Sequence, residues 1–339
     1  MKSARELLQQ LCAARHLSEA EAQELLAHLT DPDLPAAMAG ALLGALATKG
    51  VVADELRGLA RAMRARARHP GTPATLRAID IVGTGGDGSG SFNISTGTAL
   101  LTAACGVPVI KHGNRSVSSR CGSADVLEAL GVGIPSEPQA AAACLAATGF
   151  TFLFAPHYHP ATARVAPIRA ALGVRTVFNI LGPLVNPAAP PLQLVGAFSP
   201  ATGRLIADTF AGLPIERAFV VHGAAGWDEP TPVGPFTVFD VRPGSVVESM
   251  RAPADYGLRP CSVAELAGGD ATHNARALHA VLVGDERGAH RDCLLLGAAL
   301  ALEIAGIESD PRRGVARAAS AIDGGAAAAL LQALRGQSP

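Results

Sequence analysis

Residues Ala78-Ile-Asp-Ile-Val82 predict a short buried strand, and the chain runs from it directly into Gly83-Thr-Gly-Gly-Asp-Gly88. Branched aliphatic residues favour an extended strand, and glycines permit the sharp turn that follows it. A helical pattern comes next, at 98–105. Further strands are predicted at 107–110, 150–154, 192–197 and 218–221, and further helices at 124–130, 138–148 and 201–212. Alternating strands and helices predict an α/β fold with a mainly parallel sheet.

The residues before this strand show only helical patterns, from residue 3 to residue 68. Ser18 and Glu21 have the spacing of a capping box, and Gly50 stands where a helix beginning after Pro35 should end. The linker 69–73, His-Pro-Gly-Thr-Pro, then separates a helical domain (1–70) from an α/β domain (76–339). Residues 231–250 are expected to form a β excursion around Gly234-Pro235, and the end of the chain is helical again.

The last N-terminal helix, predicted at 54–68, has one apolar face and one face rich in arginine. We interpret the arginine face as solvated, with a partner surface as the alternative. Its arginines are Arg57, Arg61, Arg64, Arg66 and Arg68.

Composition excludes several classes of protein. Hydrophobic residues make up 49% of the 339 residues and charged residues 17%, which argues against a disordered chain. The formal net charge of −1 argues against a dedicated nucleic-acid or membrane-surface binder. No apolar run reaches about 18 residues, and the N-terminus lacks the apolar stretch of a signal peptide. The six cysteines form no C-x-x-C pair, so we expect reduced thiols and a cytoplasmic protein.

The glycine loop matches G-x-G-x-x-G at Gly83, Gly85 and Gly88, but the match fails as a nicotinamide-cofactor fingerprint. That fingerprint needs an acidic residue about 20 positions later, and none follows Asp87 until Asp125. No Gly-Lys-Ser/Thr follows either, which excludes a P-loop. The loop and the polar run Asn93-Ile-Ser-Thr96 at a helix start instead indicate an oxyanion cradle. The alternative is a tight strand-to-helix turn with an ordinary cap.

A second polar loop, Lys111-His-Gly-Asn-Arg-Ser-Val-Ser-Ser119, follows the strand predicted at 107–110. No carboxylate occurs between Gly88 and Ala124, although the chain has 29 Asp and Glu residues. Cations and hydroxyls without nearby acids fit a polyanionic ligand such as a phosphate plus a pyrophosphate. His112 alone is equally consistent with packing and with catalysis.

The carboxylates Asp228 and Glu229 follow the strand predicted at 218–221. If they face the anion cradle, they suit a Mg²⁺ ion, which proteins bind through one or two carboxylates plus substrate phosphates. The alternative is an acidic loop in solvent.

Together these motifs resemble those of the anthranilate phosphoribosyltransferases of tryptophan biosynthesis, which are similar in fold to the pyrimidine nucleoside phosphorylases. The resemblance also includes Gly122-Ser-Ala-Asp-Val-Leu-Glu-Ala-Leu-Gly131, His159-Pro-Ala161 and Arg175-Thr-Val-Phe-Asn-Ile-Leu-Gly-Pro183. It implies transfer of the phosphoribosyl group of phosphoribosyl pyrophosphate to the amine of anthranilate, with Mg²⁺, in two ions per site. It also implies a homodimer formed through the helical domain, which helices near 160–190 would join, and no nucleic-acid or membrane partner.

The resemblance assigns site residues by position. Those implied to hold phosphoribosyl pyrophosphate are Gly83, Gly86, Asp87, Ser91, Asn93, Ile94, Ser95, Thr96, Lys111, His112, Gly113, Asn114, Arg115, Ser116, Val117, Ser118, Ser119 and Ser123. Those implied for anthranilate are Gly83, Asn114, His159, Arg169 and Pro183, with His112 lining the approach. The implied metal ligands are Ser95, Asp228 and Glu229, and the implied catalytic residues are Lys111, His112 and Asn114.

Two segments depart from the family pattern: Thr162 stands where Met is usual, and Trp227-Asp-Glu-Pro230-Thr-Pro232 replaces a Leu-Asp-Glu segment. Both acids survive, so the departures concern acceptor fit or loop dynamics. Two other functions stay open on the residues. One is a sister enzyme with another acceptor or a nucleoside phosphorylase, and the other is a non-catalytic paralog, which should lose the acids or gain a basic surface.

Overall fold

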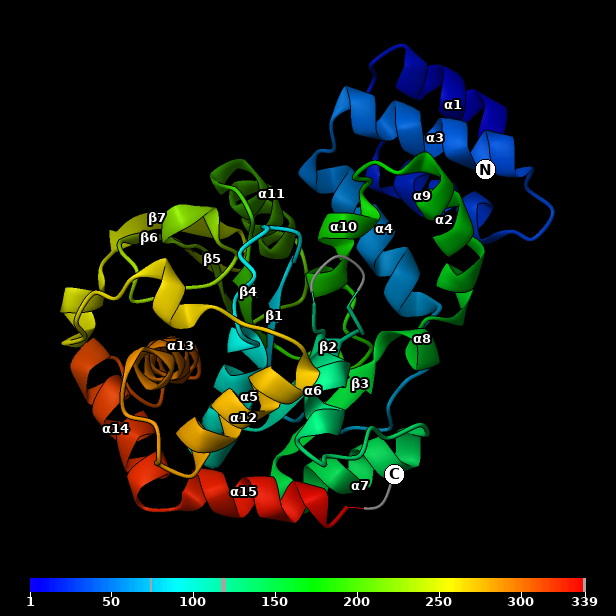
Figure 1. The fold of residues 1–339 in the computed structure, drawn as a ribbon. Helices are drawn as coiled ribbons and strands as arrows, with labels where there is room; N and C mark the ends of the chain where they lie inside the picture. Colours follow the sequence, from blue (N-terminus) through cyan, green and yellow to red (C-terminus); the bar gives the residue numbers. More distant parts are fainter. Residues whose placement is uncertain (74, 117–119, 338–339) are drawn as a thin grey trace.

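The computed structural model describes residues 1–73, 75–116 and 120–337, and it contains a helical bundle beside a larger α/β body (Figure 1). The bundle consists of α1 (Ala4–Cys12), α2 (Glu19–Thr30), α3 (Ala36–Lys49) and α4 (Ala53–Ala65). The predicted capping box is present, since the Glu21 N–H donates to Ser18 Oγ at 3.3 Å and the Ser18 N–H to Glu21 Oε2 at 2.8 Å. α3 ends at Gly50, whose φ of +84° suits glycine.

The arginine face of α4 is only partly solvated: that interpretation was wrong for Arg57 and Arg64, whereas Arg61 is exposed. Arg57 and Arg61 donate to carbonyls at the end of α11 (Pro200–Ala211), at 3.3 and 3.0 Å. Arg64 Nε donates to the Leu184 carbonyl at 2.7 Å. The guanidinium groups satisfy carbonyls that lack partners at the ends of helical segments. They therefore fasten the bundle to the α/β body.

The predicted mainly parallel sheet is confirmed. Its order is β3-β2-β1-β4-β5-β6-β7, in which β1 to β5 are parallel and β6 and β7 antiparallel. The strands are β1 (Ile79–Gly83), β2 (Val109–Gly113), β3 (Phe150–Phe154), β4 (Leu192–Gly196), β5 (Arg217–His222), β6 (Phe236–Arg242) and β7 (Ser245–Arg251). The β excursion turns at Gly244 (φ +72°), not around Gly234-Pro235, because a tight hairpin needs a positive φ.

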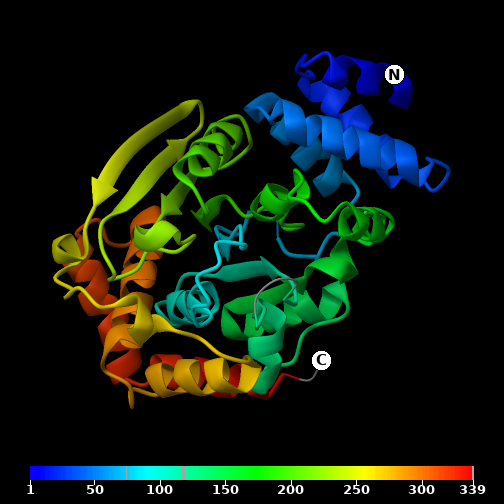
Figure 2. The ribbon, with the colours of Figure 1, turned by 45° about the horizontal axis from the view of Figure 1, so that its top comes forward.

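Helices cover both faces of the sheet (Figures 1 and 2). The longer helices of the body are α5 (Ile94–Ala104), α6 (Ser123–Ala129), α7 (Pro138–Thr148), α11, α12 (Ala271–Leu282), α13 (Ala289–Ile304), α14 (Pro311–Asp323) and α15 (Ala326–Arg335). Alternate side chains of β5 separate two cores, as the period of a strand requires. Phe219 and Val221 join the core formed with α5 and α13, whereas Ala218 and Val220 join the core shared with α4 and α11. The second of these cores therefore contains residues of both the bundle and the α/β body.

Between β3 and β4 the chain leaves the sheet and runs beside the bundle (Figure 2). This excursion contains α8 (Ala155–Tyr158), η1 (Pro160–Arg164), α9 (Ala166–Leu172), α10 (Phe178–Leu181) and η2 (Gly182–Leu184). Val165, Val177 and Leu181 are buried in the core that contains the bundle helices. Short helical turns also follow β5 and β7: η3 (Ala224–Gly226), η4 (Pro253–Tyr256) and η5 (Val263–Leu266).

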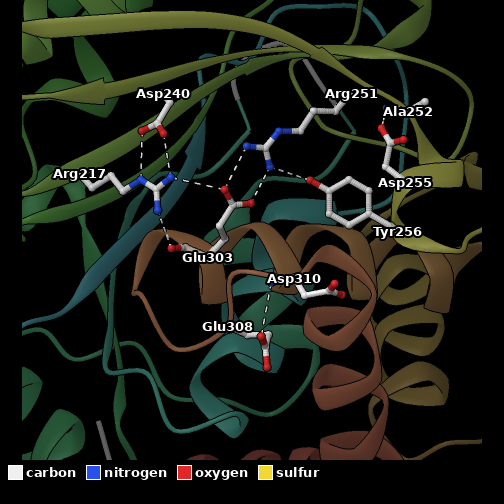
Figure 3. A network of polar contacts seen from close by, with 9 residues as sticks. All are labelled: Arg217, Asp240, Arg251, Ala252, Asp255, Tyr256, Glu303, Glu308 and Asp310. Atoms are coloured by element: carbon white, nitrogen blue, oxygen red, sulfur yellow. Dashed lines mark hydrogen bonds and ion pairs between the residues drawn. The ribbon is translucent and has the colours of Figure 1, made fainter.

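A polar network fixes the β6–β7 hairpin to the end of α13 (Figure 3). Glu303 accepts hydrogen bonds from Arg251 at 2.6 and 3.0 Å, and Arg217 lies 3.4 Å from the same carboxylate. Arg217 also donates to both oxygens of Asp240, and Arg251 donates to the hydroxyl of Tyr256 at 2.9 Å. Because Arg217 is the first residue of β5, this network lies at the amino end of the parallel strands. The carboxyl ends remain for a binding site, as in other open α/β sheets.

Across the described residues, no helix is both long and apolar enough to span a membrane.

Candidate active site

The acidic segment crosses the carboxyl ends of β1, β4 and β5, where three glycines make room for it. A Cβ on Gly196 would lie 1.5 Å from the Asp228 carbonyl oxygen, and one on Gly83 would lie 2.4 Å from Asp228 Oδ2. A Cβ on Gly223 would lie 2.0 Å from the Glu229 carbonyl oxygen. No real Cβ approaches that closely, so the position of both acids depends on glycine at each strand end.

The glycine loop donates to Asp228. The Gly85 N–H lies 2.5 Å from Asp228 Oδ2, and the Asp228 N–H donates in turn to Asp87 Oδ2 at 3.2 Å. Gly85 and Gly86 have φ of +70° and +72°, which a side chain would strain. One backbone N–H of the loop, that of Gly85, thus binds an anionic group, the carboxylate of Asp228.

The start of α5 binds the second carboxylate. The Ser95 N–H donates to Glu229 Oε1 at 3.1 Å, and Lys111 Nζ donates to Ser95 Oγ at 3.3 Å. Lys111 is 1% exposed, and its Nζ also donates to the Ile81 carbonyl at 2.5 Å. A buried ammonium at a helix N-terminus makes this corner strongly attractive to anions.

Burial destabilises the charged forms of Asp228, Glu229 and Lys111. Burial and the nearby Asp87 raise the pKa of Asp228 to about 7. Burial and Asp228 raise the pKa of Glu229 well above its ordinary value, and burial lowers the pKa of Lys111. Carboxylates that repel one another in an apolar setting are stabilised by a bound cation.

The donor set fits Mg²⁺ that is shared with a substrate. In the described part of the chain, no three His, Cys, Asp or Glu side chains form a complete metal cage. Mg²⁺ needs no such cage, because it takes one or two carboxylates and fills its remaining positions with water and phosphate oxygens. Asp228 and Glu229 would supply those carboxylates, and Ser95, whose N–H bonds to Glu229, lies on the same corner.

The second polar loop is turned toward α6. Arg115 donates to Glu128 at 2.7 and 2.8 Å and to Asp125 at 2.9 Å. Asp125 Oδ2 also accepts the Ser116 and Gly122 N–H groups, at 3.1 and 2.9 Å. These bonds fold the loop back on the helix that begins at Ser123. Val117, Ser118 and Ser119, expected to bind the substrate, lie outside the described residues.

Some of the expected phosphoribosyl ligands have other roles in this structure. Ile94 and Thr96 are buried in or beside the core, so only their backbone groups can serve a ligand. Asn93 accepts from Asn274 Nδ2 at 2.8 Å and donates to the Cys121 carbonyl at 3.3 Å. The remaining members of the set are Ser91, which accepts from Ser89 Oγ at 3.3 Å, and Gly113, Asn114 and Ser123 at the end of β2 and the start of α6.

His112, at the start of the second polar loop, packs against His159. The ring centroids of His112 and His159 are 5.1 Å apart, edge to face. Burial lowers their pKa values to about 3 and about 4, so both rings are neutral at pH 7. His112 Nε2 is buried and has no protein partner among the described residues. A neutral imidazole with a spare nitrogen suits an aromatic ligand that carries a polar group.

Arg169 lies in the last turn of α9, and its Cζ is 5.4 Å from the centroid of the Phe178 ring. It is half-buried, and no carboxylate of the described residues forms an ion pair with it. Burial lowers its pKa. Pro183, the other expected acceptor residue, is buried in η2. A guanidinium that has no carboxylate partner is available to an anionic ligand, and the Phe178 ring helps to fix its position.

The two departures from the family pattern have local roles. The Thr162 hydroxyl donates to the His159 carbonyl at 2.7 Å, so it closes the turn that carries the histidine. Trp227 is 4% exposed in the core, directly before Asp228. Its burial anchors the acidic segment, Asp228-Glu229, to the core.

Sequence reasoning missed two residues that support the site, Asp80 and Arg175. Asp80 is fully buried and accepts from the His112 N–H at 3.2 Å and from Asn186 Nδ2 at 2.8 Å. A lone carboxylate inside an apolar strand was the available signal. Arg175 donates to the Gly86 carbonyl, and its signal was its place in a quoted motif.

Comparison with known proteins agrees with this geometry. Residues 5–67 match the helical bundle domain of a glycosyl transferase family, and residues 75–328 match its a/b domain. The anthranilate phosphoribosyltransferase of Desulforudis audaxviator is 49% identical over 323 residues, which cover 95% of this chain and 93% of that protein. The enzyme of Moorella thermoacetica is 47% identical, with 96% of each chain covered.

Solved structures agree as well. The anthranilate phosphoribosyltransferase of Thermus thermophilus has a TM-score of 0.91 and 39% identity, and covers 97% of this chain and 98% of its own. The Saccharomyces cerevisiae enzyme, solved in complex with PRPP (phosphoribosyl pyrophosphate) and Mg, has a TM-score of 0.89 and 25% identity, over 98% of this chain and 97% of that chain. The chain belongs to the anthranilate phosphoribosyltransferase family, whose members transfer a phosphoribosyl group from PRPP to anthranilate in tryptophan biosynthesis.

Proposed function

We propose that the corner between the glycine loop, the start of α5 and the acidic segment binds PRPP together with Mg²⁺. The observation that carries this assignment is that two backbone N–H groups, of Gly85 and Ser95, already bind carboxylate oxygens there. Groups that bind a carboxylate also bind phosphate oxygens. The S. cerevisiae relative was solved with PRPP and Mg, which supports the same ligands here.

The reaction breaks the bond between ribose C1 and the pyrophosphate oxygen. Positive charge develops on the carbon and negative charge on the leaving group, so catalysis needs cations and N–H donors on the leaving side. Lys111 and the loop N–H groups supply them, and Asn114 follows at the end of β2. Mg²⁺, when bound, neutralises charge on the pyrophosphate.

The acceptor amine needs to be aligned with ribose C1, and it does not require a strong general base. The amine of anthranilate is uncharged at neutral pH, and once it is aligned its lone pair attacks C1 as the bond to pyrophosphate breaks. The nitrogen then loses one proton to the released pyrophosphate or to water. His112, with a pKa lowered to about 3 by burial, is too weak a base to be required as one. We assign His112, His159 and Pro183 to the walls of the acceptor channel, and Arg169 to the carboxylate of anthranilate.

Two Mg²⁺ ions per site are proposed, one near the Ser95 hydroxyl and one on Asp228 and Glu229. The count comes from the resemblance to the family, and it would give the carboxylate pair and the Ser95 hydroxyl one ion each, with water and phosphate oxygens as the other ligands. The count is measurable as the stoichiometry of Mn²⁺, as a spectroscopic substitute, bound in the presence of PRPP.

A homodimer is proposed through the helical side. An apolar groove of about 640 Å³ lies between α3 and α9, lined by the small residues Ala37, Gly40 and Ala41 and by the larger Ile168. Small side chains allow two helical surfaces to approach closely. We expect sedimentation at micromolar concentration to show a dimer, and Ala41→Glu with Ile168→Glu to shift it toward monomer. A wild-type monomer would remove this proposal.

The division into a helical domain of residues 1–70, joined by helices near 160–190, and a catalytic domain of residues 76–339 belongs to the same proposal. The contacts of α9 and α10 with the bundle core support it. A cytoplasmic location is proposed because all six cysteines are free thiols.

One assay tests the function. Purified protein is given PRPP, Mg²⁺ and anthranilate, and the loss of anthranilate fluorescence is followed. We expect turnover that requires all three components. Turnover of another aromatic amine but not of anthranilate would assign a different acceptor. Phosphate-dependent ribosyl transfer without Mg²⁺ would indicate a nucleoside phosphorylase.

A further inference from the structure

Arg175, which has no assigned role, contacts the glycine loop from the solvent side through both a hydrogen bond and an aromatic neighbour of the loop. Arg175 Nη2 donates to the Gly86 carbonyl, and Arg175 Cζ lies 4.2 Å from the centroid of the Phe198 ring. The Phe198 N–H donates to Thr84 Oγ1 at 3.3 Å. Thr84, Phe198, Arg175 and Gly86 therefore form a closed circuit that holds the loop at two points.

The hydrogen bond from Arg175 fixes the orientation of the Gly86–Asp87 peptide group. In a trans peptide, the carbonyl of Gly86 and the N–H of Asp87 point in opposite directions. With the carbonyl held by Arg175, the Asp87 N–H points away from Arg175, and it donates to no other described residue. A flip of this peptide rotates ψ of Gly86 and φ of Asp87, and the absence of a side chain at Gly86 lowers the cost of the first rotation. A flip would replace a donor with a carbonyl oxygen, which repels an anion.

Glycine at position 86 leaves room for this contact. A Cβ there would lie 3.3 Å from Arg175 Nη2, so the guanidinium would have to shift by a few tenths of an ångström. Arg175 is exposed, but its guanidinium lies over an aromatic ring, which restricts its rotation. The arginine therefore packs closely against the backbone of the loop at Gly86.

Arg175 is anchored on the helical side of the molecule, not in the sheet. It lies between α9 and α10, where the Thr176 N–H donates to Asn179 Oδ1 at 2.9 Å and Val177 is buried in the bundle core. Beside the stack is a cavity of about 190 Å³, lined by Val51 of the bundle and Leu205 of α11 among others. The guanidinium thus extends from one layer of the protein to the loop of another.

We propose that Arg175 is a positioning residue: stacked on Phe198, it holds the Gly86–Asp87 peptide in the orientation that offers the Asp87 N–H to the pyrophosphate of PRPP. The proposal rests on the proposed function, because it takes the glycine loop as the pyrophosphate cradle. It adds to that function a residue that touches neither substrate.

The test uses the full-length protein with Arg175→Ala and Arg175→Lys, and Arg204→Ala as control, an exposed arginine paired with Asp208 on its own helix. The Kd of pyrophosphate with Mg²⁺ is measured by calorimetry, and kcat and both KM values by fluorescence. We expect Arg175→Ala to raise the pyrophosphate Kd and the PRPP KM roughly 10- to 100-fold, the effect of losing a charged hydrogen bond. The anthranilate KM should stay within twofold, and Arg175→Lys should recover part of the loss.

A mutant cycle separates positioning from general support of the fold. Phe198→Leu removes the aromatic platform, and Arg175→Ala combined with Phe198→Leu should bind pyrophosphate no more weakly than Arg175→Ala alone. Amide hydrogen exchange at residues 85–88 should quicken in both single variants, while the thermal midpoint changes little.

Three results would overturn the inference in a wild type that turns over: an unchanged pyrophosphate Kd in Arg175→Ala, additive effects in the cycle, or a loss spread equally over both substrates. A wild type that neither binds pyrophosphate nor turns over PRPP would instead overturn the proposed function. If Arg175→Ala fails to fold, Arg175→Lys and Phe198→Leu carry the same measurements.

Discussion

Asp228→Asn combined with Glu229→Gln is expected to lower kcat by roughly 100-fold or more at saturating substrates, because metal-ion charge stabilisation is worth several kcal/mol. The amides keep the shape of both side chains and one acceptor oxygen each, so the bonds from Gly85 and Ser95 survive. What is lost is the negative charge that holds the ion. The dependence of rate on Mg²⁺ concentration should move to higher concentration and flatten.

Glu248→Gln, on the exposed strand β7, is the control, because it removes one negative charge far from the cradle and should leave kcat and the Mg²⁺ dependence as they are. Calorimetric titration with Mg²⁺ and pyrophosphate gives a readout independent of turnover. A double variant with the wild-type rate and Mg²⁺ titration would show that these acids do not hold the metal.

The same substitution should increase stability when Mg²⁺ is absent. The pKa of Asp228 is raised from 3.8 to about 7 by burial and by Asp87. A carboxyl group with a raised pKa binds more protons folded than unfolded, so wild-type stability falls as pH rises through this range. The variant lacks this loss. In EDTA its thermal midpoint should exceed that of wild type at pH 8, and the difference should shrink toward pH 4.

The sequence predicted the fold where a local pattern and the tertiary structure agree. The strand predicted at 150–154 and the helix predicted at 138–148 have the predicted bounds, because both are apolar, uninterrupted and followed by clear breaks. The strand predicted at 107–110 begins at Val109 and continues to Gly113. Its polar end, with Lys111 and His112, is extended only because it pairs with β3. Pairing partners far along the chain cannot be read from local pattern.

The site divides in the same way. The glycine loop and the Asp228-Glu229 pair were recognisable because each is a short contiguous motif that follows a predicted strand. The circuit of Arg175 and Phe198 was not, because it joins residues from two loops through a stack and a backbone carbonyl. Arg57 and Arg64 of α4 were misjudged for a related reason: both donate to carbonyl oxygens, and every residue has one.

Arg169→Ala is expected to raise the anthranilate KM about 10- to 150-fold, the cost of a charged hydrogen bond at about 1.5–3 kcal/mol. The guanidinium lies on the Phe178 ring and has no carboxylate partner in the described residues, so its charge is available to a ligand. A contact that is equally strong in the ground and transition states leaves kcat nearly intact. Arg276→Ala, an exposed arginine of α12 that bonds only within its own helix, is the control.

Substrates that differ by the carboxylate locate the contact. Aniline has the amine and the ring of anthranilate but no carboxylate. If Arg169 binds that group, wild type should prefer anthranilate strongly, and Arg169→Ala should lose most of the preference by using anthranilate worse while using aniline as before. Arg169→Lys keeps the charge but loses the paired donors, so it should fall between the two. An anthranilate KM within twofold of wild type in Arg169→Ala would move the carboxylate contact to Asn114 or to the pocket around His112.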